Sequence, residues 1–373
     1  MPNASDNHAD VVIIGGGMAG VSLAARLAPW LSVRLLERES QLGYHSTSRS
    51  AAMFIPNYGT PLLRQLILAS EDDLKGDMVV DGGVLSLRGE LAMVSADETD
   101  ALQTYLDGSV GLSLITPAEA AELCPILSED KFVSAVYDAK AADIDVDRLF
   151  QGFIRLAKTA GANITTNSEV KAISRKGKHW QVTTNQGDIQ ANVIVNASGA
   201  WAGVIGEMAS ASPITITPCR RSAAMITLPN DLSPDSWPMI ASISETWYAK
   251  PDAGRLMVSP ADQDPIAPCD AWADDLVLAE GIDRFEQATT IKVTRLEHQW
   301  AGLRSFADDH EPVVGFDTDA AGFFWLAGQG GNGIQTAPAL SMIAKELILG
   351  ETGPQTHADV EMLAQLSPER FVS

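Results

Sequence analysis

The pattern G-x-G-x-x-G occurs twice in the chain, once near its beginning and once near its end. Its glycines are Gly15, Gly17 and Gly20 in the first copy and Gly328, Gly330 and Gly333 in the second. Between a strand and a helix, such glycines allow a tight turn, a close backbone approach to a pyrophosphate and close packing of the helix on the sheet. The helix N-terminus then faces the phosphate charge. The pattern predicts dinucleotide binding, either by two ligands or by one ligand held from both ends of the chain.

The first copy has the full context of a dinucleotide-binding βαβ unit. The predicted elements are a buried strand at 11–15, a helix at 18–30 and a second strand at 32–37. The second strand ends in Glu37, 22 residues after Gly15 (37 − 15), where an acid accepts hydrogen bonds from ribose hydroxyls. Such an acid also repels a 2′-phosphate, which disfavours NADP. This unit predicts a dinucleotide site, and by itself it leaves NAD and FAD open.

The second copy lacks the rest of such a unit. An apolar strand at 323–328 precedes it and a helix at 336–349 follows, but the chain then turns at Gly350 instead of entering a buried strand. Glu351 falls in that turn, so it cannot present a carboxylate from a strand end. The small-residue turn 195–201 predicts a third close backbone approach. One elongated FAD explains all three turns, and the last helix would then stabilise the negative charge of a reduced flavin through its N-terminus.

Strands and helices alternate in three segments of the chain, which predicts a parallel sheet covered on both faces. The segments between them are β-rich, and 83–95 alternates in polarity around a turn. We therefore predict an α/β fold, α+β overall, with a Rossmann-like FAD-binding domain of the glutathione-reductase type and a β-rich substrate-binding domain. The predicted FAD-binding domain comprises 1–78, 140–212 and 315–373, and the predicted substrate-binding domain comprises 79–139 and 213–314.

The composition limits the classes of partner. The 373-residue chain has 26 Lys and Arg against 48 Asp and Glu, a formal net charge of −22. This charge disfavours nucleic acid and anionic membranes and favours neutral or cationic small ligands, although a solvated acidic surface is an equally simple explanation. We expect no signal peptide, no transmembrane segment and no metal site. Three scattered cysteines without a C-x-x-C pair indicate reduced thiols in a cytoplasmic protein.

Five blocks of the sequence resemble the D-amino-acid oxidase and glycine oxidase class of FAD-dependent oxidoreductases. They are the pair Glu37–Arg38, GYHSTSRSAA (43–52), VNASGAW (195–201), WAGLRSF (300–306) and GFFWLAGQGGNGIQT (322–336). Further blocks, among them YDAKAADIDVDRL (137–149) and KPDAG (250–254), are most similar to bacterial FAD-dependent D-arginine dehydrogenases. The blocks cover nearly the whole chain in the same order, so the resemblance is more specific than any single motif.

The resemblance implies an FAD site that draws on all three small-residue turns. The expected cofactor-binding residues are Gly15, Gly17, Met18, Ala19, Gly20, Glu37, Arg38, Thr47, Ser50, Ala51, Ala52, Val170, Ala197, Gly199, Trp201, Gly302, Gly331, Asn332, Gly333, Ile334 and Gln335. The residues that would line the pyrophosphate and the flavin are Thr47, Ser50, Ala51 and Ala52. Val170 would contact the adenine through its backbone. We expect non-covalent FAD, because the late cysteine to which sarcosine oxidases attach the flavin has no counterpart here.

The resemblance also implies a substrate pocket beside the flavin. Its expected residues are Arg221, Tyr248, Arg304, Tyr58, Glu90, Gly302 and Met53. The substrate carboxylate would be held by Arg221 and Tyr248 with Arg304 nearby, which suits the planar fork of a guanidinium. Gly302 would face the amine, Tyr58 would belong to a mobile loop that closes the pocket, and Glu90 would meet a cationic side chain. By residue type alone, Arg221 also fits a surface salt bridge and Glu90 a solvated turn.

Three residues depart from the D-arginine dehydrogenase pattern. Met53 and Ile55 stand where that pattern has a histidine and a threonine, and Asn332 stands where it has a tyrosine. The active-site loop is therefore more apolar than the pattern. This difference indicates a bulkier or more hydrophobic D-amino acid, or a secondary amino acid, as the substrate.

We therefore expect an FAD-dependent dehydrogenase or oxidase that deaminates D-amino acids. A hydride would pass from Cα to flavin N5, and the imino acid would hydrolyse to a 2-oxo acid and ammonia. Much of the catalysis is then orientation, so no general base is assigned. Two alternatives stay open: a secondary-amine oxidase of the sarcosine or glycine type, and a flavin subunit of a larger electron-transfer complex. A quinone or O2 is the expected electron acceptor, and a monomer or small homo-oligomer the expected state.

Overall fold

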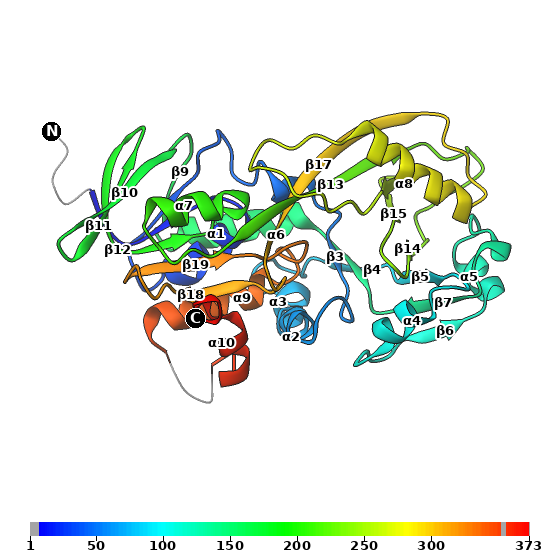
Figure 1. Cartoon of the computed structure of the whole chain (residues 1–373), viewed down its shortest axis with the longest axis horizontal. Coiled ribbons are helices and arrows are strands. Elements are labelled where there is room, and N and C mark those ends of the chain that lie inside the picture. The colour runs from blue at the N-terminus through cyan, green and yellow to red at the C-terminus, as the bar shows by residue number, and fades with distance from the viewer. Residues whose placement is uncertain (1–6, 352–355, 373) are drawn as a thin grey trace.

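The first large sheet carries the βαβ unit at the start of the chain. The computed structural model describes residues 7–351 and 356–372, and in this part of the chain the sheet has eight strands. They are β10 (Val170–Lys176), β11 (His179–Thr184), β12 (Gly187–Asn196), β1 (His8–Ile14), β2 (Val33–Leu36), β9 (Asn163–Thr165), β18 (Val313–Phe316) and β19 (Phe323–Ala327). β1 pairs in parallel with β2 and β12. β12 also pairs in parallel with β19, and Figure 1 shows these two strands next to each other. The carboxyl ends of these parallel strands therefore meet at one edge, where ligands bind in such sheets.

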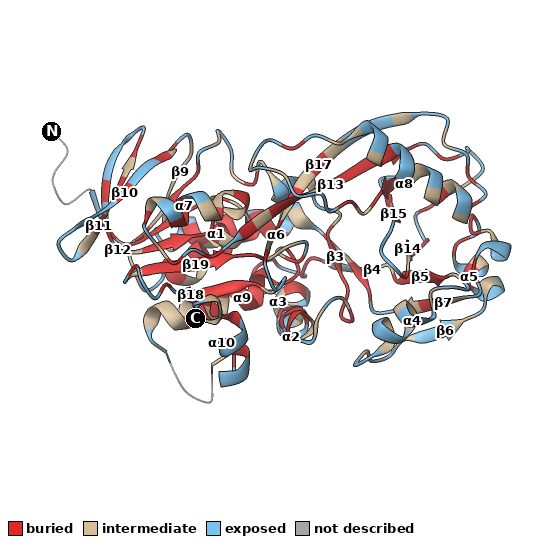
Figure 2. Cartoon of the chain, in the orientation of Figure 1, coloured by how far each residue is buried: buried red, intermediate tan, exposed pale blue. Residues whose placement is uncertain are grey.

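Alternate residues of β1 enter two separate cores. Val11 and Ile13 pack with α1 (Met18–Leu27), α6 (Val146–Thr159) and α9 (Ala337–Leu349). Val12 and Ile14 pack on the other face with α7 (Ala202–Met208) and the β10–β11 hairpin. Because both faces are covered, the strand is apolar at every position from 11 to 14. Figure 2 shows the same burial along the central strands of this sheet.

The second large sheet is built from the two β-rich segments. In the described residues it also has eight strands: β17 (Leu296–Ala307), β13 (Ile216–Ile226), β16 (Arg255–Ser259), β15 (Tyr248–Asp252), β14 (Met239–Ser242), β5 (Glu90–Val94), β7 (Ser134–Asp138) and β6 (Ser113–Ile115), in this order. The pair β14–β5 is parallel and the other neighbours are antiparallel. α8 (Asp275–Ala288) and α5 (Pro117–Leu123) pack on one face, and α4 (Thr99–Leu106) joins a smaller cluster. On the opposite face α4 packs on β5 and β7, and residues of β13, β14, β15 and β17 line a cavity.

A small third sheet lies between the two large ones. It consists of β3 (Met53–Phe54), β8 (Ala142–Ile144) and β4 (Leu85–Leu87), and Figure 1 shows β3 and β4 in the middle of the molecule. The alternating stretch 83–95 is therefore not a hairpin, because β4 pairs with β8 whereas β5 pairs with β7 and β14. Between β4 and β5, the N–H groups of Arg88 and Gly89 both donate to the carbonyl of Ala141, and this contact redirects the chain.

The other elements follow the sequence pattern closely. α1 ends at Leu27 rather than at residue 30, and α6 is capped by Asp145, whose carboxylate accepts from the Arg148 N–H at 3.0 Å. The remaining helices are α2 (Pro61–Ala69), α3 (Glu71–Lys75) and α10 (Val360–Leu366). No helix in residues 7–351 and 356–372 is long and apolar enough to cross a membrane.

The two large sheets draw their strands from different segments of the chain. The first sheet uses the segments predicted for the FAD-binding domain, apart from β18, which begins at Val313, just before the boundary predicted at 315. The second sheet uses only 79–139 and 213–314. This separation supports the proposed two-domain division, and the boundaries themselves stay a prediction.

Candidate active site

A cavity of about 370 Å³ is lined by residues of both large sheets. From the first sheet come the end of β1, the start of α1 and the turn 197–201, and from the second come residues of β13, β14, β15 and β17. The segment around 43–52 and the turn 329–335 complete the lining. All the residues predicted to bind the cofactor or the substrate line this cavity, except Gly20.

The three glycines of the first copy have different surroundings. A Cβ on Gly20 would lie 1.9 Å from the Gly15 carbonyl oxygen, and a Cβ on Gly15 would lie 2.3 Å from that of Ala197. These two glycines therefore let α1 and the turn after β12 pack against the end of β1. A Cβ on Gly17 would meet only the Thr47 hydroxyl, at 3.4 Å, because this residue faces the cavity. Gly20 thus has the packing role expected of the third glycine, and its assignment to the cofactor site stays a prediction.

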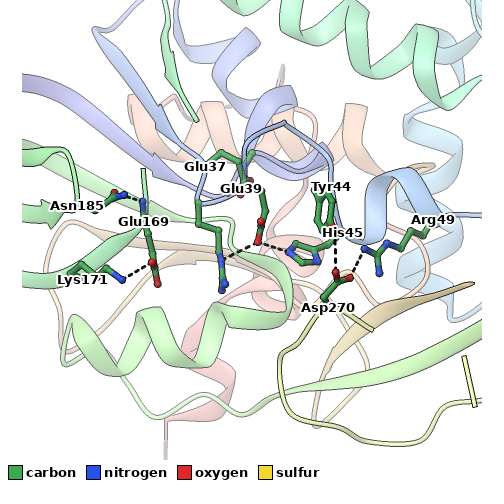
Figure 3. A network of polar contacts seen from close by, with 11 residues as sticks. Glu37, Glu39, Tyr44, His45, Arg49, Glu169, Lys171, Asn185 and Asp270 are labelled. Carbon is green, nitrogen blue, oxygen red and sulfur yellow. Dashed lines mark hydrogen bonds and ion pairs between the residues drawn. The ribbon is translucent and has the colours of Figure 1, made fainter. Parts of the chain in front are cut away.

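A buried acid directly after β2 and several polar side chains near it line the cavity. Glu37 accepts hydrogen bonds from the Gly16 and Glu39 N–H groups, each at 2.8 Å. The Arg38 guanidinium lies 4.8 Å from the centre of the Trp201 ring. His45 contacts the Glu39 carboxylate through Nε2 at 3.0 Å (Figure 3). Both the acid and the aromatic surface suit the adenosine half of a dinucleotide.

The segment 43–50 is tied to the second large sheet. Arg49 pairs with the Asp270 carboxylate at 2.6 Å and donates to the carbonyls of Ala271 and Ala301 at 3.0 and 3.1 Å. The Tyr44 hydroxyl also donates to Asp270, at 3.0 Å, and Figure 3 shows both contacts. The hydrogen bond from Arg49, with that from Tyr44, lowers the pKa of the Asp270 carboxyl. These contacts hold the cofactor segment against the sheet that carries the substrate residues.

The cavity has the features that FAD requires. The N-terminus of α1 has no acid in its first turn and no side-chain cap at Gly17, so its N–H groups other than that of Met18, which donates to the Thr47 hydroxyl at 3.0 Å, can receive a pyrophosphate. His45 Nδ1 is buried without a hydrogen-bond partner in the described residues, as expected where a ligand supplies the missing partner. At the other end of the cavity, the turn 329–335 leads into α9, whose first N–H groups are bonded within the protein: Ala337 donates to the Ile334 carbonyl and Ala339 to the Ser70 hydroxyl. FAD would therefore supply a group for the α1 terminus.

The second glycine-rich turn packs on β17 instead of starting a nucleotide unit of its own. Gly330 donates its N–H to the Ser305 carbonyl at 2.9 Å and has a φ of 54°, in the left-handed region that favours glycine. A Cβ on Gly331 would lie 2.6 Å from Arg304 Cζ. In the described residues no strand follows α9. This arrangement supports one ligand bound by both ends of the chain.

Three of the predicted substrate residues share one face of the second sheet. Arg221 of β13 lies opposite Gly302 of β17, and Arg304 lies two residues further along β17. Because side chains alternate along a strand, Arg304 is on the same face as Gly302 and Arg221. Arg221 donates through Nε to the Asp262 carbonyl at 2.7 Å, and its guanidinium lies 6.0 Å from the Tyr248 ring centre.

The two arginines form a cationic site in the cavity wall. Neither Arg221 nor Arg304 pairs with a carboxylate in the described residues. Burial, followed by the charge of Arg304, lowers the pKa of Arg221. Two adjacent guanidiniums without an anion are unfavourable, and a bound carboxylate would relieve the repulsion. The site therefore fits an anionic ligand group.

Acids and tyrosines form an acidic end of the cavity wall, and the charges of Arg304 and Arg221 also act on Tyr58. Glu90 is 5% exposed and accepts from the Tyr105 hydroxyl at 3.0 Å, and burial raises its pKa to about 7. The Tyr58 hydroxyl donates to Glu245 at 3.0 Å. Burial, with the charge of Glu245, raises the pKa of Tyr58 to about 12. This end of the cavity can accept hydrogen bonds or pair with a cation once Glu90 is ionised.

The raised pKa of Glu90 predicts a pH-dependent effect of Glu90→Gln on stability. The unfolded carboxyl ionises near 4.5, whereas the folded one stays protonated to about pH 7. The folded state therefore loses stability between these values as the pH rises. We expect Glu90→Gln, which can still accept from Tyr105, to raise the free energy of unfolding at pH 8 by up to about 3 kcal/mol and to change it little at pH 4. Denaturant unfolding at both pH values measures this effect, and the exposed Glu122→Gln is the control. Equal effects at the two pH values would contradict the assignment.

Several residues that sequence reasoning missed also line the cavity. Tyr105 and Glu245 belong to the acidic end, and Met239 and Met257 form part of an apolar wall with the predicted Met53. Methionine side chains adapt to large apolar ligands. No local motif distinguishes Tyr105, because its position depends on the packing of α4 against β5 and β7. The charge pattern gives no signal for Glu245 either, since it lies in a turn between β14 and β15.

Comparisons with known proteins agree with this arrangement. A family model described as "FAD dependent oxidoreductase" matches residues 10–347. Glycine oxidase of Bacillus subtilis (strain 168) is 25% identical over 362 residues, which are 92% of this chain and 94% of that protein. The crystal structure of glycine oxidase from Geobacillus kaustophilus has a TM-score of 0.84 at 23% identity and covers 98% of this chain and 100% of that chain. L-proline dehydrogenase from P. horikoshii has a TM-score of 0.82 at 22% identity, with 98% of each chain covered.

The family match extends over most of the chain and includes both glycine-rich turns. It confirms the predicted α/β fold with an FAD-binding core and the predicted class of cofactor. The closer likeness to D-arginine dehydrogenases and the roles of single residues stay predictions. The chain belongs to the FAD-dependent oxidoreductase family, and FAD is its cofactor.

Proposed function

We propose that this protein catalyses the oxidative deamination of D-amino acids, with a side-chain preference that differs from that of D-arginine dehydrogenases. The observation that carries the proposal is the pair Arg221 and Arg304, which line the FAD cavity on one sheet face without a carboxylate partner in the described residues. An amino acid brings the carboxylate that this pair lacks. The D-configuration rests on the resemblance of the sequence blocks.

Binding and orientation of the substrate would be the main tasks of the protein residues. The Arg221 Nε is held by the Asp262 carbonyl, which leaves the terminal N–H groups for a carboxylate. Gly302 stands opposite Arg221 and would contact the amine through its backbone, since the position of a Cβ on Gly302 is already in contact with Arg49 Cβ at 3.5 Å. Bound FAD would supply the acceptor for the hydride, which carries both electrons of the Cα–H bond. Fixing the carboxylate and the amine at two points of one sheet face would orient Cα toward the flavin.

The side-chain end of the substrate would face the apolar wall and the acidic end of the cavity. The wall includes Met53, Ile55 and Met239. These residues favour a large apolar side chain, whereas ionised Glu90 would favour a cationic one. The same cavity can therefore select differently at different pH values.

We expect the preference for basic substrates to rise with pH. Below its pKa of about 7 the Glu90 carboxyl is neutral, and above it the carboxylate attracts the side-chain ammonium of D-lysine. The ratio of kcat/KM for D-lysine to that for D-methionine should rise about tenfold between pH 6 and pH 8.5, because a hydrogen bond to a charged group is worth about 1.5–3 kcal/mol. In Glu90→Gln the ratio should stay flat. A ratio that rises equally in both proteins would remove Glu90 from substrate recognition.

The decisive experiment is an anaerobic panel of substrates. The purified FAD-loaded protein is mixed with D-amino acids, their L-enantiomers and N-methyl amino acids, and bleaching of the flavin absorbance is recorded. Bleaching by D-amino acids alone supports the proposal, and bleaching by L-amino acids alone contradicts it. Repeating the active pairs in air with oxygen uptake separates an oxidase from a dehydrogenase.

A secondary-amine oxidase of the sarcosine or glycine type is the second candidate. It is favoured by the similarity to glycine oxidases and by the apolar residues Met53 and Ile55 at the active-site loop. Bleaching by sarcosine or glycine, with slow bleaching by larger D-amino acids, would support it. If no compound of the panel bleaches the flavin, a subunit that needs a partner becomes the better explanation.

A further inference from the structure

The segment 53–58 forms part of the cavity wall, and several parts of the protein contact it. It begins beside Ala52, which has a φ of 32° although it is not a glycine. A non-glycine residue keeps such a backbone conformation only where its surroundings impose it. At the far end of the segment stands Tyr58, whose hydroxyl contacts Glu245 of the second sheet's β14–β15 turn. The path between these two residues must therefore be fixed by other contacts.

One such contact comes from the cofactor turn. The Ile55 N–H donates to Gln335 Oε1 at 3.0 Å, and Gln335 Nε2 donates to Asn332 Oδ1 at 2.8 Å. Gln335 and Asn332 are each 6% exposed. The orientation of the Gln335 amide follows from chemistry, because the reverse orientation would place its NH2 group against the N–H of Ile55. The relay thus links the backbone of the active-site segment to the turn that lines the cavity before α9.

Both ends of this relay are rigidly placed. The Asn332 carbonyl accepts from the N–H and the hydroxyl of Thr336 at 3.0 and 2.8 Å, and its N–H donates to the Gln329 carbonyl at 2.9 Å. At the other end, the Tyr58 N–H donates back to the Ile55 carbonyl at 3.1 Å. A displacement of the Ile55 backbone would therefore move Tyr58 as well.

The second anchor of the segment is independent of the cofactor turn. The Asn57 side chain donates to the Asp138 carboxylate at 2.8 Å and accepts from the Val110 N–H at 2.9 Å. This anchor joins the segment to the second sheet alone. Phe54 packs in the core of the first sheet, and the link through Gln335 is the hydrogen-bonded connection between the segment and the cofactor turn.

We propose that Gln335 is a positioning residue that ties the segment 53–58 to the cofactor turn, and that Asn332 holds the Gln335 amide in the orientation this requires. Gln335 then acts on substrate binding through Ile55 and Tyr58. The part of the proposal that concerns substrate rests on the proposed function. The relay itself does not, because it joins protein atoms only.

The first test is Gln335→Leu, which removes both hydrogen bonds at similar side-chain size. In the FAD-loaded protein without substrate, hydrogen exchange at the Ile55 amide should become about tenfold faster or more, because its acceptor is lost. The KM of the amino acid substrate should rise about tenfold, with a smaller change in kcat. Gln151→Leu, on the exposed face of α6, is the matched control and should change neither quantity.

Conservative variants separate positioning from general destabilisation. Asn332→Asp keeps both hydrogen bonds and should retain slow exchange at Ile55, whereas Gln335→Glu keeps the acceptor for Ile55 but loses the donor to Asn332 and should show intermediate protection. Asn332→Leu should show intermediate protection. The melting temperature of each variant shows whether it folds, and the conservative pair keeps the test available if Gln335→Leu does not.

The outcomes distinguish the relay from the proposed function. Unchanged exchange at Ile55 in Gln335→Leu would overturn the relay, as would equal loss of protection throughout the chain. Loss of protection in Gln335→Glu to the same degree as in Gln335→Leu would also overturn it. If no amino acid bleaches the flavin of the wild-type protein, the proposed function fails, and the exchange measurements still decide whether the relay exists.

Discussion

Arg221→Met is expected to lower kcat/KM for amino acid substrates by about 10²- to 10³-fold while FAD stays bound. Removing one partner of a buried, hydrogen-bonded charge pair costs about 2–5 kcal/mol. The loss should appear mainly as a raised KM, because the guanidinium binds the carboxylate before and during the reaction. Steady-state kinetics with an artificial electron acceptor measure both constants, and the flavin absorbance reports the bound cofactor. Arg221 contacts the protein through the Asp262 carbonyl and has no ion pair in the described residues, so the fold should tolerate the change.

Two further variants complete this test. Arg221→Lys retains the charge but not the planar fork, so its activity should lie between those of wild type and Arg221→Met. Arg255→Met, which removes an exposed arginine paired with Glu297 at 2.9 Å, is the matched control and should leave the kinetics unchanged. Kinetics in Arg221→Met that equal those of the control would remove the carboxylate assignment.

Gly17→Val is expected to weaken FAD binding about 100-fold, or about 3 kcal/mol, without unfolding the protein. The new side chain would meet only Thr47 within the protein and would project into the space that the pyrophosphate needs. Its backbone φ of −79° is ordinary for any residue, so no conformational strain is added. Fluorescence titration of the apoprotein with FAD measures affinity, and circular dichroism reports the fold.

Two other glycines provide comparison variants for Gly17→Val. Gly203→Val, on α7, also enters open space and should keep wild-type affinity. Gly20→Ala should instead prevent correct folding, because its Cβ would lie 1.9 Å from the Gly15 carbonyl oxygen. Retained FAD affinity in Gly17→Val would show that the pyrophosphate does not lie at this helix terminus.

The sequence alone determined the cofactor side of the protein. The βαβ unit around Gly15 and Glu37 is contiguous, so its strand, turn, helix and second strand are encoded by local periodicity and glycine spacing. The absence of a further buried strand directly after 336–349 was also readable, and it turned two apparent nucleotide sites into one. Local patterns of this kind can be recognised without knowledge of the rest of the fold.

The substrate side depended on the tertiary structure. Arg221 and Gly302 meet only through the pairing of β13 with β17, and Glu90 meets Tyr105 only because α4 packs beside β5. The turn at Gly89 could not reveal that β4 and β5 belong to different sheets. β4 pairs with β8, whereas β5 pairs with β7. Strand register and sheet membership are set by contacts between residues far apart in the chain, and no local pattern encodes them. Local sequence thus determined which cofactor this protein binds, and long-range pairing decided which side chains surround the substrate.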